Sequence, residues 1–262
     1  MATINKTCVS CSGQFTITAA DEEFYSKVQA PSPKTCPRCR MQRRFAYRNE
    51  RALFAGTCAQ CQKNILSLYQ PTDGLTVYCQ TCWWGDDWDP VDFGQAIDWN
   101  RSFLEQYQEV RRRVPRLALV AMNSDNSDYT NMCADNKNCY LLFASENCEN
   151  CSYGKLVQKC KDSFDNCFLY DSELCYECIN CRNCFQCTYV KDSQDSRESH
   201  YSLGLKGCSN VFLCSDLHNK EYYIKNKPVP AADYAKQVAE LLKDRNHCYQ
   251  EWLQLAKGRV VK

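Results

Sequence analysis

The spacing of the cysteines constrains this chain more than any other feature of its sequence. Eight of the 22 cysteines lie in the first 82 residues, and all eight belong to CxxC pairs. Another 13 lie between residues 133 and 214, and Cys248 follows alone. Because the 50 residues from 83 to 132 contain no cysteine, we place a boundary there.

The cellular context decides how these cysteines are interpreted. The longest apolar run, residues 117–122, is far shorter than the ~20 residues of a membrane-spanning helix. The N-terminal residues lack the apolar core of a signal peptide. We therefore expect a cytoplasmic protein with no membrane association, where CxxC pairs usually bind metal. A secreted disulfide scaffold is the alternative.

The four CxxC pairs fall into two modules. The first contains Cys8, Cys11, Cys36 and Cys39, and the second contains Cys58, Cys61, Cys79 and Cys82. A CxxC turn places two thiolates on one side of a loop, and two such turns complete the tetrahedron that Zn²⁺ prefers. Because protein fills all four positions, each site is structural. We predict two structural zinc ions, with iron, crossed pairing between the modules and redox-active CxxC pairs as alternatives.

Three short motifs follow one another in the first module. They are Cys8-Val-Ser-Cys11, then Glu23-Phe24-Tyr25, then Cys36-Pro37-Arg38-Cys39-Arg40. In this order, over residues 6–44, they resemble the small treble-clef family known as the probable zinc-ribbon domain. The resemblance implies zinc binding but no activity. The whole layout, with its Trp83-Trp84 pair and Cys-rich tail, is similar to Cys-rich zinc-ribbon proteins of ultrasmall, candidate-phylum bacteria.

A basic segment follows the first module. Residues 1–60 carry nine Lys and Arg against four Asp and Glu. Six of the nine are the candidate nucleic-acid contacts Arg38, Arg40, Arg43, Arg44, Arg48 and Arg51. On one helix, four of them would form a stripe from residue 40 to residue 51. Guanidinium groups bind phosphate in bidentate fashion, so we predict contact with an RNA backbone. A solvated face, or pairing with this protein's own acids or with a protein partner, is the alternative.

The tryptophans of the WWGDDWDP stretch have two interpretations. Trp83, Trp84 and Trp88 could stack on bases if they were exposed. Nearby aspartates would repel phosphate, however, and small zinc modules need large core residues. We therefore expect these side chains to pack.

The second half of the chain repeats asparagine–cysteine steps. A lag of 21 residues aligns Cys139 with Cys160 and Cys181, and aligns Phe143 with Phe164 and Phe185. A coil of ~20 residues suits a parallel β-helix in which asparagine turns the corners and cysteine fills the interior. We expect about four coils. This half carries eight basic against 14 acidic residues from 123 to 218.

One run of cysteines does not fit a strand that alternates every two residues. It repeats every three residues, at Cys175, Cys178, Cys181, Cys184 and Cys187. Buried ladder thiols are the preferred interpretation, and further zinc sites or disulfides are the alternatives.

Two helices are expected outside the cysteine regions. Phe103, Tyr107 and Val110 recur at helical spacing, and Pro115 ends that helix. Pro230 begins the second helix. We expect both to be packing elements.

No catalytic motif is present. The three histidines, His200, His218 and His247, match no metalloprotease spacing, and the chain has no P-loop, GxGxxG or GxSxG. We therefore predict that the protein is not an enzyme.

The predicted fold is mixed: small zinc-stabilised modules plus a mainly-β part. Its parts are zinc module 1 with the basic helix (1–55), zinc module 2 (56–92), a helical bridge (93–122), a Cys-rich β-solenoid (123–228) and a C-terminal helix (229–262). The predicted function is zinc-dependent RNA binding, with RNA or the ribosome as partner. A scaffold that binds a protein partner on the acidic solenoid is the alternative, and a thiol-based metal store or redox buffer is the third.

Overall fold

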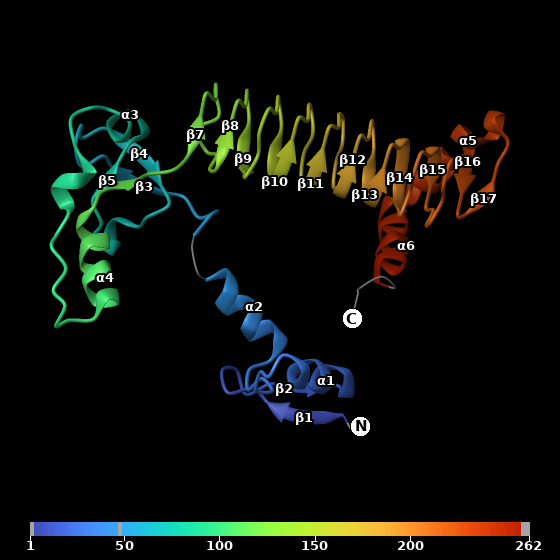
Figure 1. The fold of residues 1–262 in the computed structure, drawn as a ribbon. Coiled ribbons are helices and arrows are strands. Elements are labelled where there is room, and N and C mark those ends of the chain that lie inside the picture. The colour runs from blue at the N-terminus through green and yellow to red at the C-terminus, as the bar shows by residue number, and fades with distance from the viewer. Residues whose placement is uncertain (1–2, 47–48, 258–262) are drawn as a thin grey trace. The chain divides into compact units, whose positions relative to one another are not determined.

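The computed structural model describes residues 3–46 and 49–257 and divides into two compact units, Met1–Asn49 and Glu50–Lys262 (Figure 1). The fold is mainly β, with a long solenoid followed by C-terminal helices. None of the helices in the described ranges combines the length and the apolar character needed to cross a membrane.

The first unit is built on a two-stranded hairpin. β1 (Ile4–Thr7) pairs antiparallel with β2 (Gln14–Ile17), and α1 (Ala19–Lys27) follows. A capping box begins α1: the Thr18 hydroxyl accepts from the backbone N–H of Asp21, whose carboxylate accepts from the backbone N–H of Thr18.

The basic helix is shorter than the sequence predicted. α2 (Pro37–Phe45) begins after Cys36 and is capped at Ala46. The prediction of one arginine stripe along a helix to residue 51 was wrong, because Arg51 lies beyond the helix and in the second unit. Arg48 lies outside the described residues. No residue of α2 is buried, so no core contact is available to lengthen a short helix that is marginal in water by itself.

The second unit begins with another small module. Its elements are the antiparallel hairpin of β3 (Phe54–Thr57) and β4 (Asn64–Ser67), the 3₁₀ turn η1 (Pro71–Asp73), β5 (Val77–Tyr78) and α3 (Gln80–Trp83). The short turn η2 (Pro90–Phe93) and α4 (Phe103–Arg113) follow. As predicted, α4 ends before Pro115.

Two of the three tryptophans pack as predicted. The Trp83 and Trp88 rings lie 4.8 Å apart, and the Trp88 indole donates to the backbone carbonyl of Trp83 at 3.0 Å. Tyr78 and Phe93 contact Trp88 from other sides. Trp84 is instead 68% exposed.

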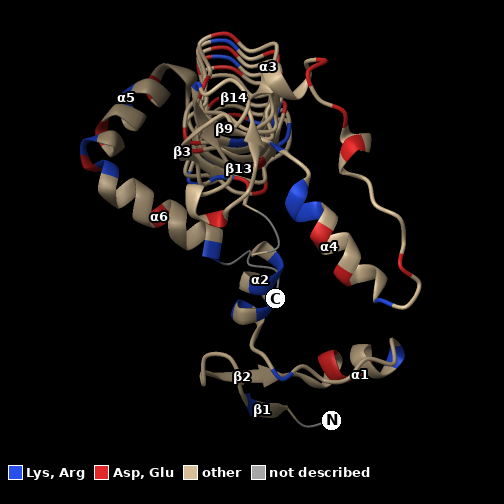
Figure 2. Ribbon diagram, turned by 90° about the vertical axis from the view of Figure 1, so that its left-hand side faces the viewer, with Lys and Arg blue, Asp and Glu red and all other residues tan. Residues whose placement is uncertain are grey.

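The solenoid is a stack of short parallel strands. β6 (Arg116–Leu117) pairs with β5 of the module before it, and β7 (Ala121–Met122) pairs with β8 (Cys133–Ala134). The nine-stranded sheet then contains β9 (Tyr140–Phe143), β10 (Ser152–Gln158), β11 (Cys167–Tyr170), β12 (Ile179–Arg182), β13 (Thr188–Gln194), β14 (Arg197–Leu203), β15 (Ser209–Phe212), β16 (Glu221–Ile224) and β17 (Lys227–Pro228). Viewed along its length, the coils superpose (Figure 2).

Each coil is 12 residues long. Lys155 pairs with Cys167, and Cys167 pairs with Ile179, so each step along the sheet advances the chain by 12 residues. The prediction of about four coils with a 21-residue period was therefore wrong.

A left-handed backbone conformation at every third residue produces this short coil. From Met132 to Lys225, every third residue has a positive φ, including Asn138, Asn147 and Asn150. Each such residue turns the chain, and the next side chain points into the solenoid, as Cys139 and Cys148 do. Asn and Asp tolerate this conformation better than other non-glycine residues. The predicted role of asparagine at the corners is thus confirmed.

The period of three also explains the run of cysteines that fits no strand. Cys175, Cys178, Cys181, Cys184 and Cys187 are all at most 2% exposed, because each follows a corner residue. The interior between corners accepts only one side chain per side of the coil. The preferred interpretation of buried ladder thiols is therefore confirmed.

Polar side chains at inward positions satisfy backbone groups of the next coil. The Ser163 hydroxyl accepts from the backbone N–H of Cys175 at 3.1 Å and donates to the carbonyl of Lys161 at 2.8 Å. Asn136 accepts in the same way from the N–H of Cys148 at 2.9 Å. Because these bonds leave no backbone donor unpaired in the interior, small polar and apolar residues alternate there without penalty.

The C-terminal segment packs on the last coils as two helices. Its elements are α5 (Ala231–Leu241), the short turn η3 (Leu242–Asp244) and α6 (Arg245–Lys257). Tyr234 and Val238 from α5 and Trp252 from α6 share a buried cluster with Phe212. The prediction of one helix with this apolar stripe was right in its packing role. The helix is interrupted at η3.

Candidate metal centres and the basic helix

The first candidate metal centre joins the hairpin of the first unit to α2. Cys8 and Cys11 lie on the turn between β1 and β2, Cys36 is the N-cap of α2, and Cys39 lies in its first turn. The four sulfur atoms lie within 4.8 Å of one another, and the Sγ atoms of Cys11 and Cys36 are 3.8 Å apart. The four predicted ligands are therefore together in space.

Backbone donors make this centre favourable for thiolates. The N–H of Cys36 points at the Cys8 sulfur at 3.2 Å, and the N–H of Cys39 points at the Cys36 sulfur at 3.4 Å. The hydrogen bond from Cys36 lowers the pKa of Cys8 to about 6. Hydrogen bonding with Cys11 instead raises the pKa of Cys39 to about 12, so that thiol keeps its proton at neutral pH until a cation replaces it.

The second candidate metal centre repeats this geometry in the second unit. Cys58 and Cys61 lie between β3 and β4, and Cys79 and Cys82 bracket the start of α3, with all four sulfur atoms within 4.8 Å of one another. The N–H of Cys79 lies 3.3 Å from the Cys58 sulfur. Burial raises the pKa of Cys58, but backbone N–H groups of Cys61 and Cys79 outweigh it and lower the pKa to about 6.

The two centres have the chemistry of structural metal sites. Four sulfur donors at tetrahedral spacing fit a soft or borderline divalent ion and leave no position for a reacting water. The sulfurs group in sequence order, so the alternative of crossed pairing between the modules is excluded.

The thiols of the solenoid have a different environment. Among the described residues, no other group of three metal-ligating side chains meets this spacing, and all 22 cysteines are free of disulfides. The Cys139 thiol instead lies 3.4 Å from the carbonyl of Lys137 and 3.5 Å from that of Cys148. Further zinc sites and disulfides, the two alternatives for this region, therefore find no support in the geometry.

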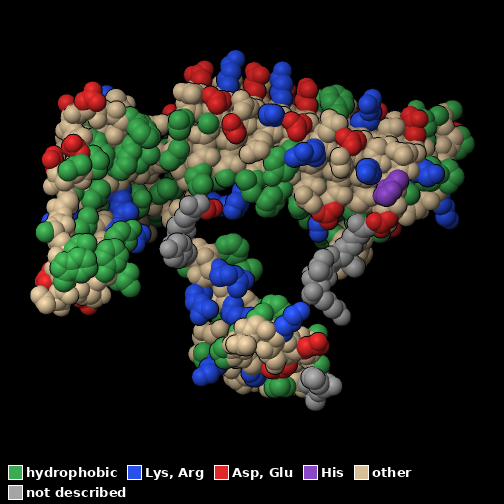
Figure 3. Space-filling view, in the orientation of Figure 1, with side chains coloured by type: hydrophobic (Ala, Val, Ile, Leu, Met, Phe, Trp, Pro, Cys, Tyr) green, Lys and Arg blue, Asp and Glu red, His purple; other side chains and the backbone are tan. Residues whose placement is uncertain are grey.

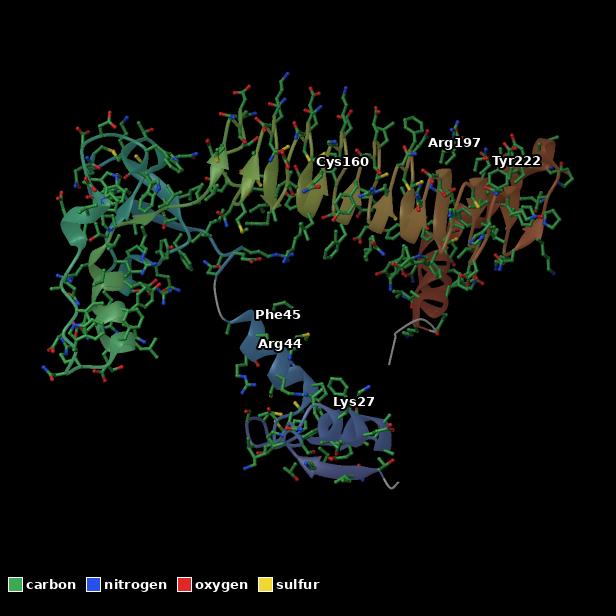
Figure 4. All side chains as sticks on the ribbon, in the orientation of Figure 1. Lys27, Arg44, Phe45, Cys160, Arg197 and Tyr222 are labelled. Carbon is green, nitrogen blue, oxygen red and sulfur yellow. The ribbon has the colours of Figure 1, made fainter. Side chains whose placement is uncertain are left out.

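The predicted arginines divide into three kinds. Arg38, Arg43 and Arg44 are exposed on α2, and none has an ion-pair partner among the described residues. Figure 2 shows the basic character of this helix, and Figure 4 shows Arg44 beside Phe45 on its last turn. Arg40 instead donates to the Tyr25 hydroxyl at 3.0 Å, so it holds α2 against α1.

The three histidines stay apart from the metal centres. His200 is buried, which lowers its pKa, and its Nδ1 lies 2.6 Å from the Thr188 hydroxyl. His247 lies at helical spacing from Glu251, with the closest atoms 3.5 Å apart. His218 pairs with Lys206 through the backbone of neighbouring coils.

Sequence reasoning missed one surface feature, a series of exposed aromatic side chains along the solenoid. The sequence signal was present, because Tyr140, Phe164 and Tyr176 are separated by multiples of 12. With a 21-residue lag, these residues do not align.

Comparisons with known proteins identify no relative. No protein-family model matches the chain, and no curated protein is detectably similar to it. The functional argument therefore rests on the geometry described above.

Proposed function

We propose that this protein is a zinc-stabilised, non-catalytic RNA-binding protein that contacts the phosphate backbone through α2. The observation that carries the proposal is the set of exposed guanidinium groups of Arg38, Arg43 and Arg44, unpaired among the described residues on a helix anchored by metal ligands. Residues 1–49 carry eight Lys and Arg against three Asp and Glu, a net charge of +5. Structured RNA, such as that of the ribosome, is the proposed partner.

Zinc would fix the orientation of the basic helix. Cys36 and Cys39 lie at the start of α2, so an ion held there ties the helix to the hairpin. Without metal, a module with so few buried side chains has little to hold it folded. The order of hairpin, CxxC turn and ligand-bearing helix agrees with the treble-clef resemblance of residues 6–44. Free thiols throughout the chain agree with a reducing cytoplasm.

RNA binding across a salt series tests the proposal. Zinc-loaded protein should bind RNA with an affinity that falls steeply with salt, because phosphate contacts release counterions. Arg43→Ala with Arg44→Ala should weaken binding and reduce the salt slope by about 1.4, or ~0.7 per phosphate contact on single strands. Lys27→Ala with Lys34→Ala removes the same charge from the same unit and should change the slope little.

Absence of binding at low salt, with the metal bound and the fold intact, would refute the proposal. Equal losses in the arginine and lysine variants would also refute it, because they would reduce the effect to net charge.

A protein-interaction scaffold is the second candidate. Exposed aromatic side chains on the solenoid favour it, because contiguous exposed apolar surface commonly marks a binding site. That surface is the subject of the next inference, which does not depend on RNA binding.

A further inference from the structure

One side of the solenoid carries aromatic side chains in consecutive coils. Tyr140, Ser152, Phe164 and Tyr176 follow one another in register, and the Tyr129 and Tyr153 rings lie 5.4 and 5.7 Å from that of Tyr140. We call Tyr129, Tyr140, Tyr153, Phe164 and Tyr176 the exposed aromatic rows. Their side chains are 39–53% exposed.

The same side of the solenoid is covered farther along by the chain itself. The Tyr176 ring contacts that of Tyr189 at 5.6 Å, and Tyr189 lies under Tyr249 and Trp252 of α6, at 5.3 and 5.8 Å. Tyr201, one coil beyond Tyr189, is only 5% exposed. This side of the solenoid therefore binds a helix that presents aromatic side chains, and five rings of it lack such cover.

A helix with the required face is present elsewhere in the second unit. Phe103 and Tyr107 of α4 stack with their ring centroids 6.2 Å apart, yet they are 63% and 54% exposed. Leu104 beside them is 67% exposed. Figure 3 shows hydrophobic side chains gathered over this part of the molecule. The sequence predicted that these residues would pack. Within the chain they do not, because Gln106 is the residue of α4 that turns inward.

The charges of the two surfaces are complementary. Arg111 lies one helical turn beyond Tyr107 on the same stripe, and Arg111 and Arg112 have no ion-pair partner among the described residues. Asp165 and Glu177 each follow a ring of the exposed aromatic rows, and neither is paired among the described residues. Burial and the charge of Asp165 raise the pKa of Glu177, so a cation docked there would be favourable.

We propose that α4 of one molecule packs on the exposed aromatic rows of a second copy, and that the reciprocal contact closes a two-fold dimer. Each chain carries both the helix and the rows, so one two-fold axis covers all four unpartnered surfaces. Phe103 and Tyr107 take the place on the rows that Tyr249 and Trp252 of α6 take on Tyr189. Arg111 and Arg112 face Asp165 and Glu177.

Sedimentation velocity of the full, metal-loaded chain tests the proposal. Wild-type protein should sediment at twice the 30.3 kDa mass of the chain. The row variant Tyr140→Asp with Tyr153→Asp and the helix variant Phe103→Asp with Tyr107→Asp should each weaken dimerisation by at least about tenfold. All four side chains are exposed, so both variants should keep the wild-type circular dichroism spectrum.

Mixing the two variants gives the decisive result. The row variant keeps an intact α4 and the helix variant keeps intact rows, so a heterodimer has one complete contact. An equimolar mixture should therefore associate more strongly than either variant alone. Phe185→Asp, which changes a ring of 43% exposure in another register of the solenoid, should leave the dimer unchanged.

Three results would overturn the proposal. The first is a wild-type monomer at concentrations up to about 100 µM, which would leave the rows to a partner of another kind. The second is a dimer that persists in either variant. The third is a mixture that associates no better than its components.

Discussion

The Ser145 hydroxyl accepts a hydrogen bond of 3.2 Å from the backbone N–H of Val157, which lies 12 residues farther along the chain and one coil farther along the solenoid. The same bond joins Ser127 to Cys139 and Ser202 to Cys214. A backbone N–H also reaches inward thiols, as that of Cys151 reaches Cys139. One short side chain per side of each coil therefore fills the interior and pairs the backbone of the next coil.

Removing one such acceptor should destabilise the solenoid. Ser163→Ala leaves the N–H of Cys175 buried without its partner, and we expect a loss of about 1–3 kcal/mol in the free energy of unfolding. Ser163→Cys should cost less, because a thiol can accept weakly at the same position. Urea denaturation followed by circular dichroism measures both. Equal losses would show that volume, rather than the hydrogen bond, governs the site.

The left-handed corners should reject β-branched side chains. Asn147 has a φ of 54° and an exposed side chain, so Asn147→Val should destabilise the solenoid by about 1–2 kcal/mol through backbone strain alone. The neighbouring residue Glu146 is equally exposed but does not have a positive φ, and Glu146→Val is the matched control. We expect that control to stay within about 0.5 kcal/mol of wild type in the same denaturation experiment.

The metal content should follow the two centres independently. Cys36→Ser with Cys39→Ser should reduce tightly bound zinc from two ions to one, measured by mass spectrometry of the eluted metal. The solenoid should keep its circular dichroism signal, because the second unit is compact by itself. Cys184→Ser, which changes a buried solenoid thiol, should leave two ions bound. A metal store would instead lose zinc in proportion to the thiols removed.

The affinity for zinc should rise with pH above neutrality. With a pKa of about 6, Cys8 is already a thiolate at pH 7, whereas Cys39, with a pKa of about 12, is still protonated and must release its proton when the ion binds. Between these two pKa values, each released proton makes binding roughly tenfold tighter per pH unit. Competition with a chromogenic chelator from pH 7 to 9 measures this dependence. An affinity that is constant over that range would contradict the assignment of the protons.

The RNA and the dimerisation experiments separate the two surfaces. Arg43→Ala with Arg44→Ala should change RNA binding and leave the sedimentation of the protein unchanged. Tyr140→Asp with Tyr153→Asp should do the reverse. A variant that altered both properties would link the two surfaces, and neither proposal contains such a link.

The sequence by itself determined the local features of this protein. Two CxxC turns close a ligand set over a short stretch of chain, so the groups at Cys8–Cys39 and Cys58–Cys82 could be predicted. Pro115 and Pro230 fixed helix boundaries for the same local reason. Asparagine before cysteine marked the corners, because few other residues accept a positive φ.

Only the tertiary structure decided how these features combine. A three-residue repeat produces matches at every multiple of three, so a lag of 21 looked convincing. The closure of four sides set the period at 12. Stacking at that period brings Tyr140 and Tyr153 together on one side, a neighbourhood that no single stretch of sequence encodes. The length of α2 was likewise set by packing, because no core contact lengthens the helix beyond Phe45.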